Sequence, residues 1–465
     1  MDEQQTAFVE TFRRFIDELI NVPRPRPEML TPLGEVVQSF LGTDVTALPL
    51  VTEDLPPHRL VDVDLALEAL ASQSPHSQLV GVSGGQQREQ SAFPELLSNP
   101  FMRFAPGPVD YVERATGPDT SRQVVAFGLR LLQVDGHPLA VLQRGSRPEH
   151  GRPAAKLEVL TADPATSALF LARVRRLMLE RSVLRGQVLS FTGNEYSPGA
   201  AGATFLPRPD VQASDIILPA GVLEDVAGHV VGIGEHRNAL RAVGQHLKRG
   251  VLLYGPPGTG KTLTVRHLLS RTPGTTAVLL TGTSIRFITE AAELARAMQP
   301  AIVVLEDVDL VAAERGMFGG PQPLLFAVLD ALDGLDTDAD VAFILTTNRV
   351  DVLEQALAQR PGRVDLAMEI PLPDADCRRR LFALYARELP LSAAAVADAA
   401  DRSEGMTGSF AKELMRRTVL LAAQEERPAA DADLTAALDA LLSAREHLTR
   451  SLLGGHDRRH PAPQS

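Results

Sequence analysis

The stretch VLLYGPPGTGKT, residues 251–262, decides how the rest of this 465-residue sequence is read. It contains the pattern G-x-x-x-x-G-K-T from Gly255 to Thr262, after an apolar run that predicts a strand and before TLTVRHLLS, which predicts a helix. Backbone N–H groups and the positive end of a helix converge on such a loop, so we expect it to bind phosphate groups. Lys261 is expected to reach the β- and γ-phosphates of a nucleotide, and Thr262 to hold Mg²⁺. The alternative is an ordinary glycine-rich turn, which this strand-to-helix context disfavours.

Three later segments place polar side chains where strands are expected to end. The apolar run AIVVL is followed by Glu306 and Asp307, which can serve Mg²⁺ and the attacking water. The run FILTT is followed by Asn348, whose amide can orient water near a γ-phosphate. Arg360 and Arg363 then flank a Pro-Gly turn. Such a pair is often solvated surface, but its place after three phosphate-site elements favours an arginine finger that acts on a neighbouring subunit.

Taken in this order, the elements resemble the AAA family of ATPases (AAA+ superfamily) over about residues 216–452. The resemblance implies an α/β fold of the P-loop NTPase type, in which a parallel sheet is flanked by helices and followed by a helical lid. It identifies the glycine-rich loop as Walker A, Ile302–Asp307 as Walker B and Asn348 as sensor 1. It also implies ATP and Mg²⁺ as cofactors and a homo-oligomer, a hexameric ring, in which Arg360 and Arg363 complete the neighbour's site.

The resemblance further assigns contacts to the rest of the nucleotide. Gly232 and Ile233 match the segment that lies against the adenine at the start of the ATPase module. Gly408 and Ser409 match the start of the sensor 2 helix, and Tyr385 stands where many members carry a histidine that contacts the ribose. Within the loop, the expected nucleotide contacts are Gly255, Pro256, Pro257, Gly258, Thr259, Gly260, Lys261, Thr262 and Leu263.

The acidic pair departs from the family pattern, because the usual order Asp-Glu is inverted to Glu306-Asp307. Asp309 fixes the register, since the family places another acid two residues after the pair. A shift of one residue would turn every strand side chain to the other face. Glu306 is therefore expected on the metal side and Asp307 beside the attacking water. The mitochondrial Rieske-protein translocase family has the same inversion, so we expect the chain to hydrolyse ATP.

The segment between the two phosphate motifs is shorter than in FtsH-type members. It lacks the aromatic-hydrophobic-glycine pore loop that grips a threaded polypeptide, and Phe287 is its only aromatic residue. The alternative for Phe287 is a helix residue that faces the core. The sequence also lacks the motif H-E-x-x-H, so the chain is not expected to be a metalloprotease by itself.

Upstream of the ATPase module, one hairpin stands out. Asp135-Gly136 lies between two apolar runs, which predicts antiparallel strands joined by a two-residue turn. From composition and rhythm, the expected divisions are an N-terminal helical and loop region (1–104), a small α/β domain (105–195), a linker (196–215), a large P-loop subdomain (216–386), a helical lid subdomain (387–452) and a disordered tail (453–465).

Composition and charge exclude several classes of protein. The formal net charge of −12 disfavours a bulk nucleic-acid binder. No apolar run approaches the roughly 18 residues needed to cross a bilayer, and the acidic N-terminal stretch lacks the pattern of a signal peptide. We therefore expect a cytoplasmic protein without membrane insertion. The single cysteine, Cys377, excludes an internal disulfide and a cysteine metal cluster.

Three functions stay open on the sequence. The first is a Mg-ATP-hydrolysing oligomeric ATPase that remodels or chaperones protein clients. The second is a nucleotide-gated scaffold with slow or vestigial hydrolysis, which the inverted acids and the short segment allow. The third, a nucleic-acid loader ATPase, is disfavoured by the net charge and by the lack of a basic stripe. Nothing in residues 1–195 identifies a client protein.

Overall fold

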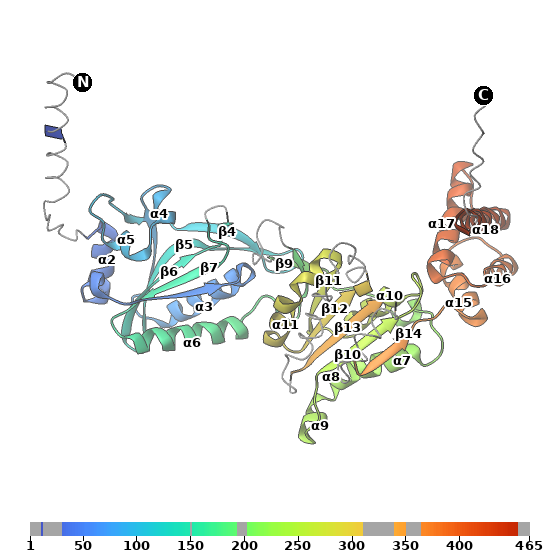
Figure 1. Ribbon diagram of the computed structural model, residues 1–465, viewed down its shortest axis with the longest axis horizontal. Helices are drawn as coiled ribbons and strands as arrows, with labels where there is room; N and C mark the ends of the chain where they lie inside the picture. The colour runs from blue at the N-terminus through green and yellow to red at the C-terminus, as the bar shows by residue number, and fades with distance from the viewer. Residues whose placement is uncertain are drawn as a thin grey trace, which may run out of the picture. The chain divides into compact units, whose positions relative to one another are not determined.

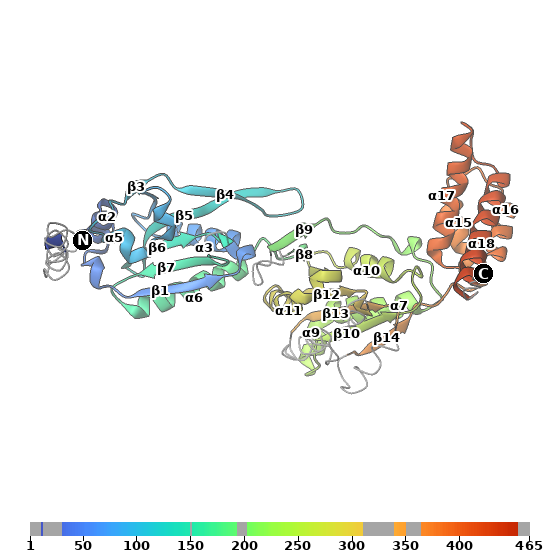
Figure 2. The same ribbon diagram turned by 45° about the horizontal axis from the view of Figure 1, so that its top comes forward.

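The computed structural model describes residues 11–12, 30–148, 151–192, 202–309, 339–349 and 364–453, of which 445–453 are described as backbone only. These residues form two compact units, each with its own apolar core (Figures 1 and 2). The first unit holds the described residues between 30 and 182, except the hairpin tip 115–120. The second holds the described residues from 183 onward.

The first unit is built on a seven-stranded sheet in the order β1-β7-β6-β5-β2-β3, with β4 paired to β5. The central hairpin β5–β6 confirms the predicted turn, because Val134 pairs with His137 and both turn residues, Asp135 and Gly136, have positive φ (51° and 83°). The strands are β1 (Leu50–Leu55), β2 (Gln78–Ser83), β3 (Ala105–Gly107), β4 (Asp110–Ala115), β5 (Ser121–Val134), β6 (His137–Arg144) and β7 (Ala155–Leu160).

Helices pack on both faces of this sheet, as the alternation along β5 shows. Leu129 and Leu131 join the core formed with α2 and α5, whereas Arg130 between them pairs with Asp64 of α3 on the other face. Figures 1 and 2 show α3 and α6 together on one side of the sheet. The helices are α2 (Pro32–Leu41), α3 (Leu60–Gln73), α4 (Gln87–Gln90), α5 (Phe93–Leu97) and α6 (Pro164–Glu180), with short 3₁₀ turns at Val45–Ala47 and Pro57–Arg59.

The expected boundary at residue 104 does not separate two units. β1 and β2 come from the expected helical and loop region, yet they pair with β7 and β5 of the expected small domain. Both strands are only six residues long. β1 carries charged residues in an edge strand and β2 runs into a glycine-rich loop, so neither showed a clear alternation of apolar residues.

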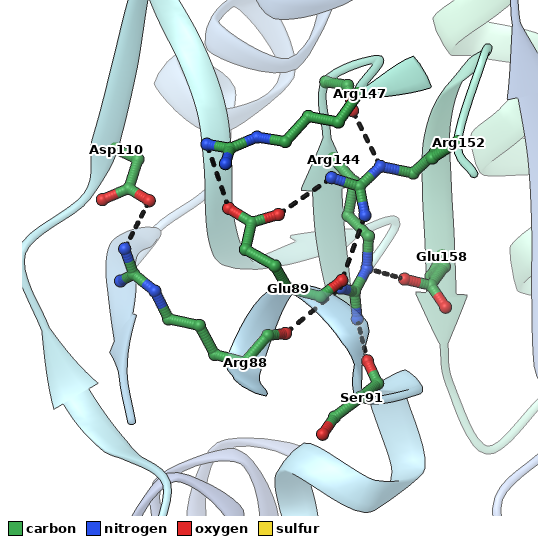
Figure 3. Close-up of polar contacts among 9 residues, drawn as sticks. Arg88, Glu89, Ser91, Asp110, Arg144, Arg147, Arg152 and Glu158 are labelled. Atoms are coloured by element: carbon green, nitrogen blue, oxygen red, sulfur yellow. Dashed lines mark hydrogen bonds and ion pairs between the residues drawn. The ribbon is translucent and has the colours of Figure 1, made fainter. Parts of the chain in front are cut away.

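A buried network of arginines and carboxylates fastens α4 to the sheet (Figure 3). Arg144 of β6 is 4% exposed, pairs with Glu158 of β7 at 2.5 Å between Nε and Oε2, and donates to the Ser91 carbonyl at 2.8 Å. Arg152 donates to the carboxylate and to the carbonyl of Glu89, at 2.8 and 3.1 Å. Carbonyls at the end of a helix lack helical partners, and the two guanidinium groups supply those partners here.

The second unit contains a seven-stranded sheet in the order β14-β10-β13-β12-β11-β8-β9. All its pairings are parallel except β8–β9. This confirms the predicted α/β class, since continuous apolar runs are typical of parallel strands covered on both faces. The strands are β8 (Val188–Thr192), β9 (Gly202–Leu206), β10 (Arg249–Tyr254), β11 (Thr276–Thr281), β12 (Ala301–Glu306), β13 (Val341–Thr347) and β14 (Leu366–Glu369).

The two faces of this sheet have separate cores, one with α7 and α10 and the other with α11. A further core joins α15 to α18 as the helical lid. None of the described helices is long and apolar enough to span a lipid bilayer. The helices are α7 (Val222–Ala227), α8 (Ile233–Glu235), α9 (Arg237–Ala242), α10 (Lys261–Ser270), α11 (Ile288–Ala297), α15 (Ala375–Ala386), α16 (Ala393–Arg402), α17 (Gly408–Gln424) and α18 (Asp431–Leu453), with η4 at Ala213–Asp215, the π-helical turn η5 at Gly228–Gly232 and η6 at Gly282–Phe287.

The expected linker 196–215 overlaps this sheet. β9 pairs with β8 along its whole length, and β8 pairs with β11, so both belong to the second unit. The glycine and proline content on either side of β9 led us to predict a linker. The short strand itself, GATFL, gave too few residues to establish a period.

Candidate functional site

A cavity of about 400 Å³ lies in the second unit where the glycine-rich loop, the ends of the central strands and the lid meet. The loop contributes residues 257–263, and Asp307 and Asn348 contribute from the strand ends. Tyr385, Gly408 and Ser409, three predicted nucleotide contacts, line it from helices α15 and α17. The structure therefore brings together residues that lie up to about 150 positions apart in the chain.

Two glycines of the loop occupy positions that other residues would not fit. Gly255 has a φ of 143°, and a Cβ there would lie 2.2 Å from the carbonyl oxygen of Ile370. Gly258 has a φ of 79°, and its Cβ would lie 2.8 Å from Oγ of Ser409. The backbone N–H of Ser409 also donates to the Gly258 carbonyl at 3.2 Å. The loop and the first turn of α17 are therefore in direct contact.

Lys261 is 5% exposed at the start of α10. Its Nζ donates to the carbonyls of Gly255 and Pro256, at 2.8 and 2.9 Å, and to Oδ1 of Asn348 at 2.8 Å. All three acceptors are neutral oxygens. Burial lowers the pKa of Lys261, while the charges of Asp307 and Asp309 act in the opposite direction. A buried ammonium held beside a polar cavity can bind an anion such as phosphate.

Glu306, the last residue of β12, lies next to Thr262 of α10. Burial raises the pKa of the Glu306 carboxyl and nearby Asp307 raises it further, whereas the hydrogen bond from Thr262 and the charge of Arg266 lower it. A carboxylate and a hydroxyl are the kind of oxygen ligands that Mg²⁺ accepts when water and phosphate complete its shell. The residues present therefore fit a Mg²⁺ ion.

Asp307 and Asn348 meet at the cavity from neighbouring strands. The Asn348 amide donates from Nδ2 to Oδ1 of Asp307 at 3.3 Å, while its Oδ1 accepts from Lys261. Asp307 has a φ of 53°, a left-handed conformation that is uncommon outside glycine. Lys261, Asn348 and Asp307 thus form one polar chain across three elements.

Gly232 and Ile233 are not among the residues that line the cavity, and their contact with the adenine stays a prediction. They lie in η5 and α8 near Arg249, whose Nε donates to the Val230 carbonyl at 3.0 Å. Arg249 begins β10, and the phosphate loop follows the other end of that strand. The Gly-Ile pair fitted the family pattern by letters alone, without any constraint on distance from the loop.

Several cavity residues were missed by the sequence reading. Asp215 and the apolar segment Ile216–Pro219 line the cavity, and Leu218 lies 3.9 Å from a Cβ built on Gly260. Two cations, Arg266 and Lys412, were also missed. Both could have been found from helical spacing, since each lies four residues after a predicted contact, Thr262 and Gly408. The remaining new lining residues are Pro371, Pro373 and Leu381.

Two other predictions concern residues that do not line the cavity, Phe287 and the arginine pair. Phe287 is 7% exposed, and its ring lies 6.1 Å from that of Phe191 in the core beside α11, so its core-facing alternative is the correct one. Arg360 and Arg363 lie outside the described residues.

Comparison with known proteins agrees with this geometry. Residues 251–372 match the family "ATPase family associated with various cellular activities (AAA)". The ATP-dependent zinc metalloprotease FtsH 1 of Symbiobacterium thermophilum is 30% identical over 308 residues, which cover 61% of this chain and 49% of the relative. The proteasome-activating nucleotidase of Thermococcus onnurineus is 28% identical over 279 residues, 57% of this chain and 70% of the relative. That of Methanococcus maripaludis is 32% identical over 234 residues, 47% of this chain and 57% of the relative. The chain thus spans about half the length of the FtsH relative.

Proposed function

The chain contains an ATPase domain of the AAA family, and from this premise we propose that the whole protein is a Mg-ATP-hydrolysing oligomeric motor that remodels protein clients. One observation carries the proposal. Among the described residues, the hydrogen bonds of the buried Lys261 ammonium run to neutral oxygens, and Lys261 lies beside a cavity large enough for a nucleotide. The triphosphate of ATP would supply the countercharge.

The loop and helix α10 would bind the phosphates. Backbone N–H groups between Pro257 and Thr262 would donate to phosphate oxygens, for which Lys261 would exchange its neutral acceptors. The base would lie between Asp215–Pro219 and the lid residues Tyr385 and Gly408, because these line the part of the cavity contributed by the lid and by the segment before the loop. The hydrogen bond from the Ser409 N–H to the Gly258 carbonyl would couple movement of the loop to movement of α17.

Thr262 and Glu306 would hold Mg²⁺, which when bound neutralises charge on the β- and γ-phosphates. Asp307 would accept a proton from the attacking water, and Asn348 would orient that water between Asp307 and the γ-phosphate. In support, Asn348 already bonds both Lys261 and Asp307. Glu306 contacts Thr262 and Asp307 contacts Asn348, which is the division of roles that we proposed for the inverted pair.

Arg360 and Arg363 would act in the site of the adjacent subunit in a homohexameric ring. Support comes from their position in the sequence and from relatives that are themselves named as ATP-dependent or as nucleotidases. Such a finger contributes about three to five decades to turnover in well-studied enzymes. The first unit would then select the client, since it has its own core and lies outside the matched ATPase residues.

Arginine replacement tests the ring most sharply. Arg363→Ala should retain ADP and ATP affinity and lose most phosphate release, with Arg349→Ala as a control that also removes an arginine downstream of β13. Mixing Arg363→Ala with Asp307→Asn subunits should restore part of the turnover, because some interfaces then combine an intact finger with an intact acid. Unchanged turnover in Arg363→Ala would contradict sharing between subunits. Rings that assemble on ATP but release negligible phosphate would favour the nucleotide-gated scaffold.

A further inference from the structure

The ends of β12 and β13 are joined by two reciprocal bonds between side chains and backbone. The strands pair in parallel as far as Leu305 and Leu345. Beyond that point the N–H of Asp307 donates to Oγ1 of Thr346 at 3.0 Å. In return, the N–H of Asn348 donates to Oδ1 of Asp309 at 3.1 Å. Each strand end is therefore fixed by a side chain of the other.

The first of these bonds falls where the backbone is strained. Asp307 has a φ of 53°, a left-handed conformation that a residue with a Cβ adopts less readily than glycine does. Such conformations persist when the surroundings hold them. Thr346 is suited to that task, since it is 1% exposed and its β-branched side chain has few rotamers in a packed strand.

The direction of the Asp307 side chain depends on this backbone conformation. With its N–H held by Thr346, Asp307 presents Oδ1 to Nδ2 of Asn348 at the cavity. A relaxed, right-handed backbone at Asp307 would turn the carboxylate away from Asn348. We propose that Thr346 is a positioning residue for ATP hydrolysis, whose hydroxyl keeps the Asp307 carboxylate aligned with the γ-phosphate side of the site. The inference rests on the proposed function.

The variant Thr346→Val tests this, because it keeps the shape of the side chain and removes the acceptor. We expect kcat to fall about 10- to 100-fold, as for a small misplacement of a reacting group. The KM for ATP and the Kd for ADP should stay within about twofold, because the phosphate loop and α10 are unchanged. Thr346→Ser keeps the hydroxyl and should restore most of kcat. A purely structural role would not produce this split between kcat and KM.

Thr276→Val is the matched control. Thr276 is also fully buried, and its Oγ1 also accepts a backbone N–H, that of Gly186 at 3.0 Å, but it begins β11 at the opposite end of the sheet from the site. It should lower the thermal midpoint of the second unit and leave kcat unchanged. If Thr346→Val unfolds that unit, Thr346→Ala replaces it in the same comparison.

The outcomes separate the inference from the proposed function. Wild-type protein without Mg-ATP turnover at any concentration would remove the proposed function, and the inference with it. If wild type turns over and Asp307→Asn does not, the function stands. In that case a kcat of Thr346→Val equal to wild type, or lowered no more than in Thr276→Val, would overturn the inference alone.

Discussion

Each unit buries cations, and two of them, Arg144 and Lys261, differ in their countercharge. Arg144 in the first unit pairs with Glu158 at 2.5 Å, and its other bonds end on main-chain carbonyls (Figure 3). Lys261 in the second unit is equally buried, but its three bonds end on neutral oxygens. The charge of Arg144 is met by a hydrogen-bonded carboxylate. The carboxylates of Asp307 and Asp309, by contrast, act on Lys261 without a hydrogen bond to it among the described residues.

This difference separates structural from functional charge. Removing one member of a buried ion pair leaves the other charge buried and unpaired, which lowers the free energy of unfolding. A buried cation without a bonded carboxylate already bears a cost of desolvation in the free protein, and an anionic ligand removes it. Thermal unfolding with and without ADP distinguishes the two, because a ligand raises only the transition of the unit that binds it. The ADP-shifted transition reports the second unit, and the other transition reports the first.

The largest expected effect comes from removing the cation of the site. Lys261→Met should lower phosphate release by at least about 10³-fold and abolish most of the ADP-induced shift. Without nucleotide the second unit should be as stable as wild type or more so, because no carboxylate loses a bonded partner. A clear loss of stability in the free variant would show that Lys261 is structural, and would remove the contrast with Arg144.

The opposite pattern is expected for Arg144→Met. Leaving the Glu158 carboxylate buried and unpaired should destabilise the first unit by about 3–5 kcal/mol, without changing the ADP-shifted transition. Arg122→Met is the matched control, since Arg122 and Glu68 form an exposed pair in the same unit, and it should cost at most about 1 kcal/mol. Equal losses in the two variants would indicate that burial of the Arg144–Glu158 pair adds nothing.

A smaller effect is expected at the lid. Lys412 lines the cavity from α17, where it is exposed, so Lys412→Met should weaken ADP binding about 5- to 10-fold by removing one charged contact. Isothermal titration of both chains with ADP measures this directly. Lys412→Arg should retain the affinity, and a methionine variant with wild-type affinity would exclude Lys412 from the nucleotide contacts.

The smallest effect is a dependence on pH. Burial lowers the pKa of His229 and the charge of Arg249 adds to this, while Asp365, 4.0 Å away, opposes it. Because the folded state disfavours protonation of His229, the second unit should keep its full stability above the ordinary pKa of about 6.5. It should lose part of that stability as the pH falls below this value. His229→Asn should flatten the change in the ADP-shifted midpoint between pH 7 and 5.5. Exposed His246→Asn should leave it as in wild type.

The parallel sheet and the polar residues at its strand ends could be predicted from the sequence, because the patterns that indicate them lie within a few residues of one another. The loop with Gly255 and Gly258 needs backbone conformations and close approaches that only glycine allows. Apolar runs before Glu306 and Asn348 identify covered parallel strands. Such short-range constraints are readable without a structure.

Contacts between segments far apart in the sequence were harder to predict. Ile216–Pro219 reaches the cavity through tertiary packing, which the sequence did not indicate, whereas the Gly232-Ile233 pair was chosen by resemblance. β1 and β2 are strands of only six residues, which is too short for a periodicity argument to identify them. The hydrogen bond from the Asp307 N–H to Thr346 likewise depends on the register of β12 against β13, which cannot be predicted from a local sequence pattern.

The measurement that tests the central claim most directly is ATP turnover against protein concentration, for wild type and Asp307→Asn, with particle mass recorded on the same samples. We predict that turnover per subunit rises steeply as a ring forms and collapses in the variant, while ADP still shifts the transition of the second unit in both. Turnover per subunit that is independent of concentration, or that survives in Asp307→Asn, would contradict a motor whose site is completed between subunits.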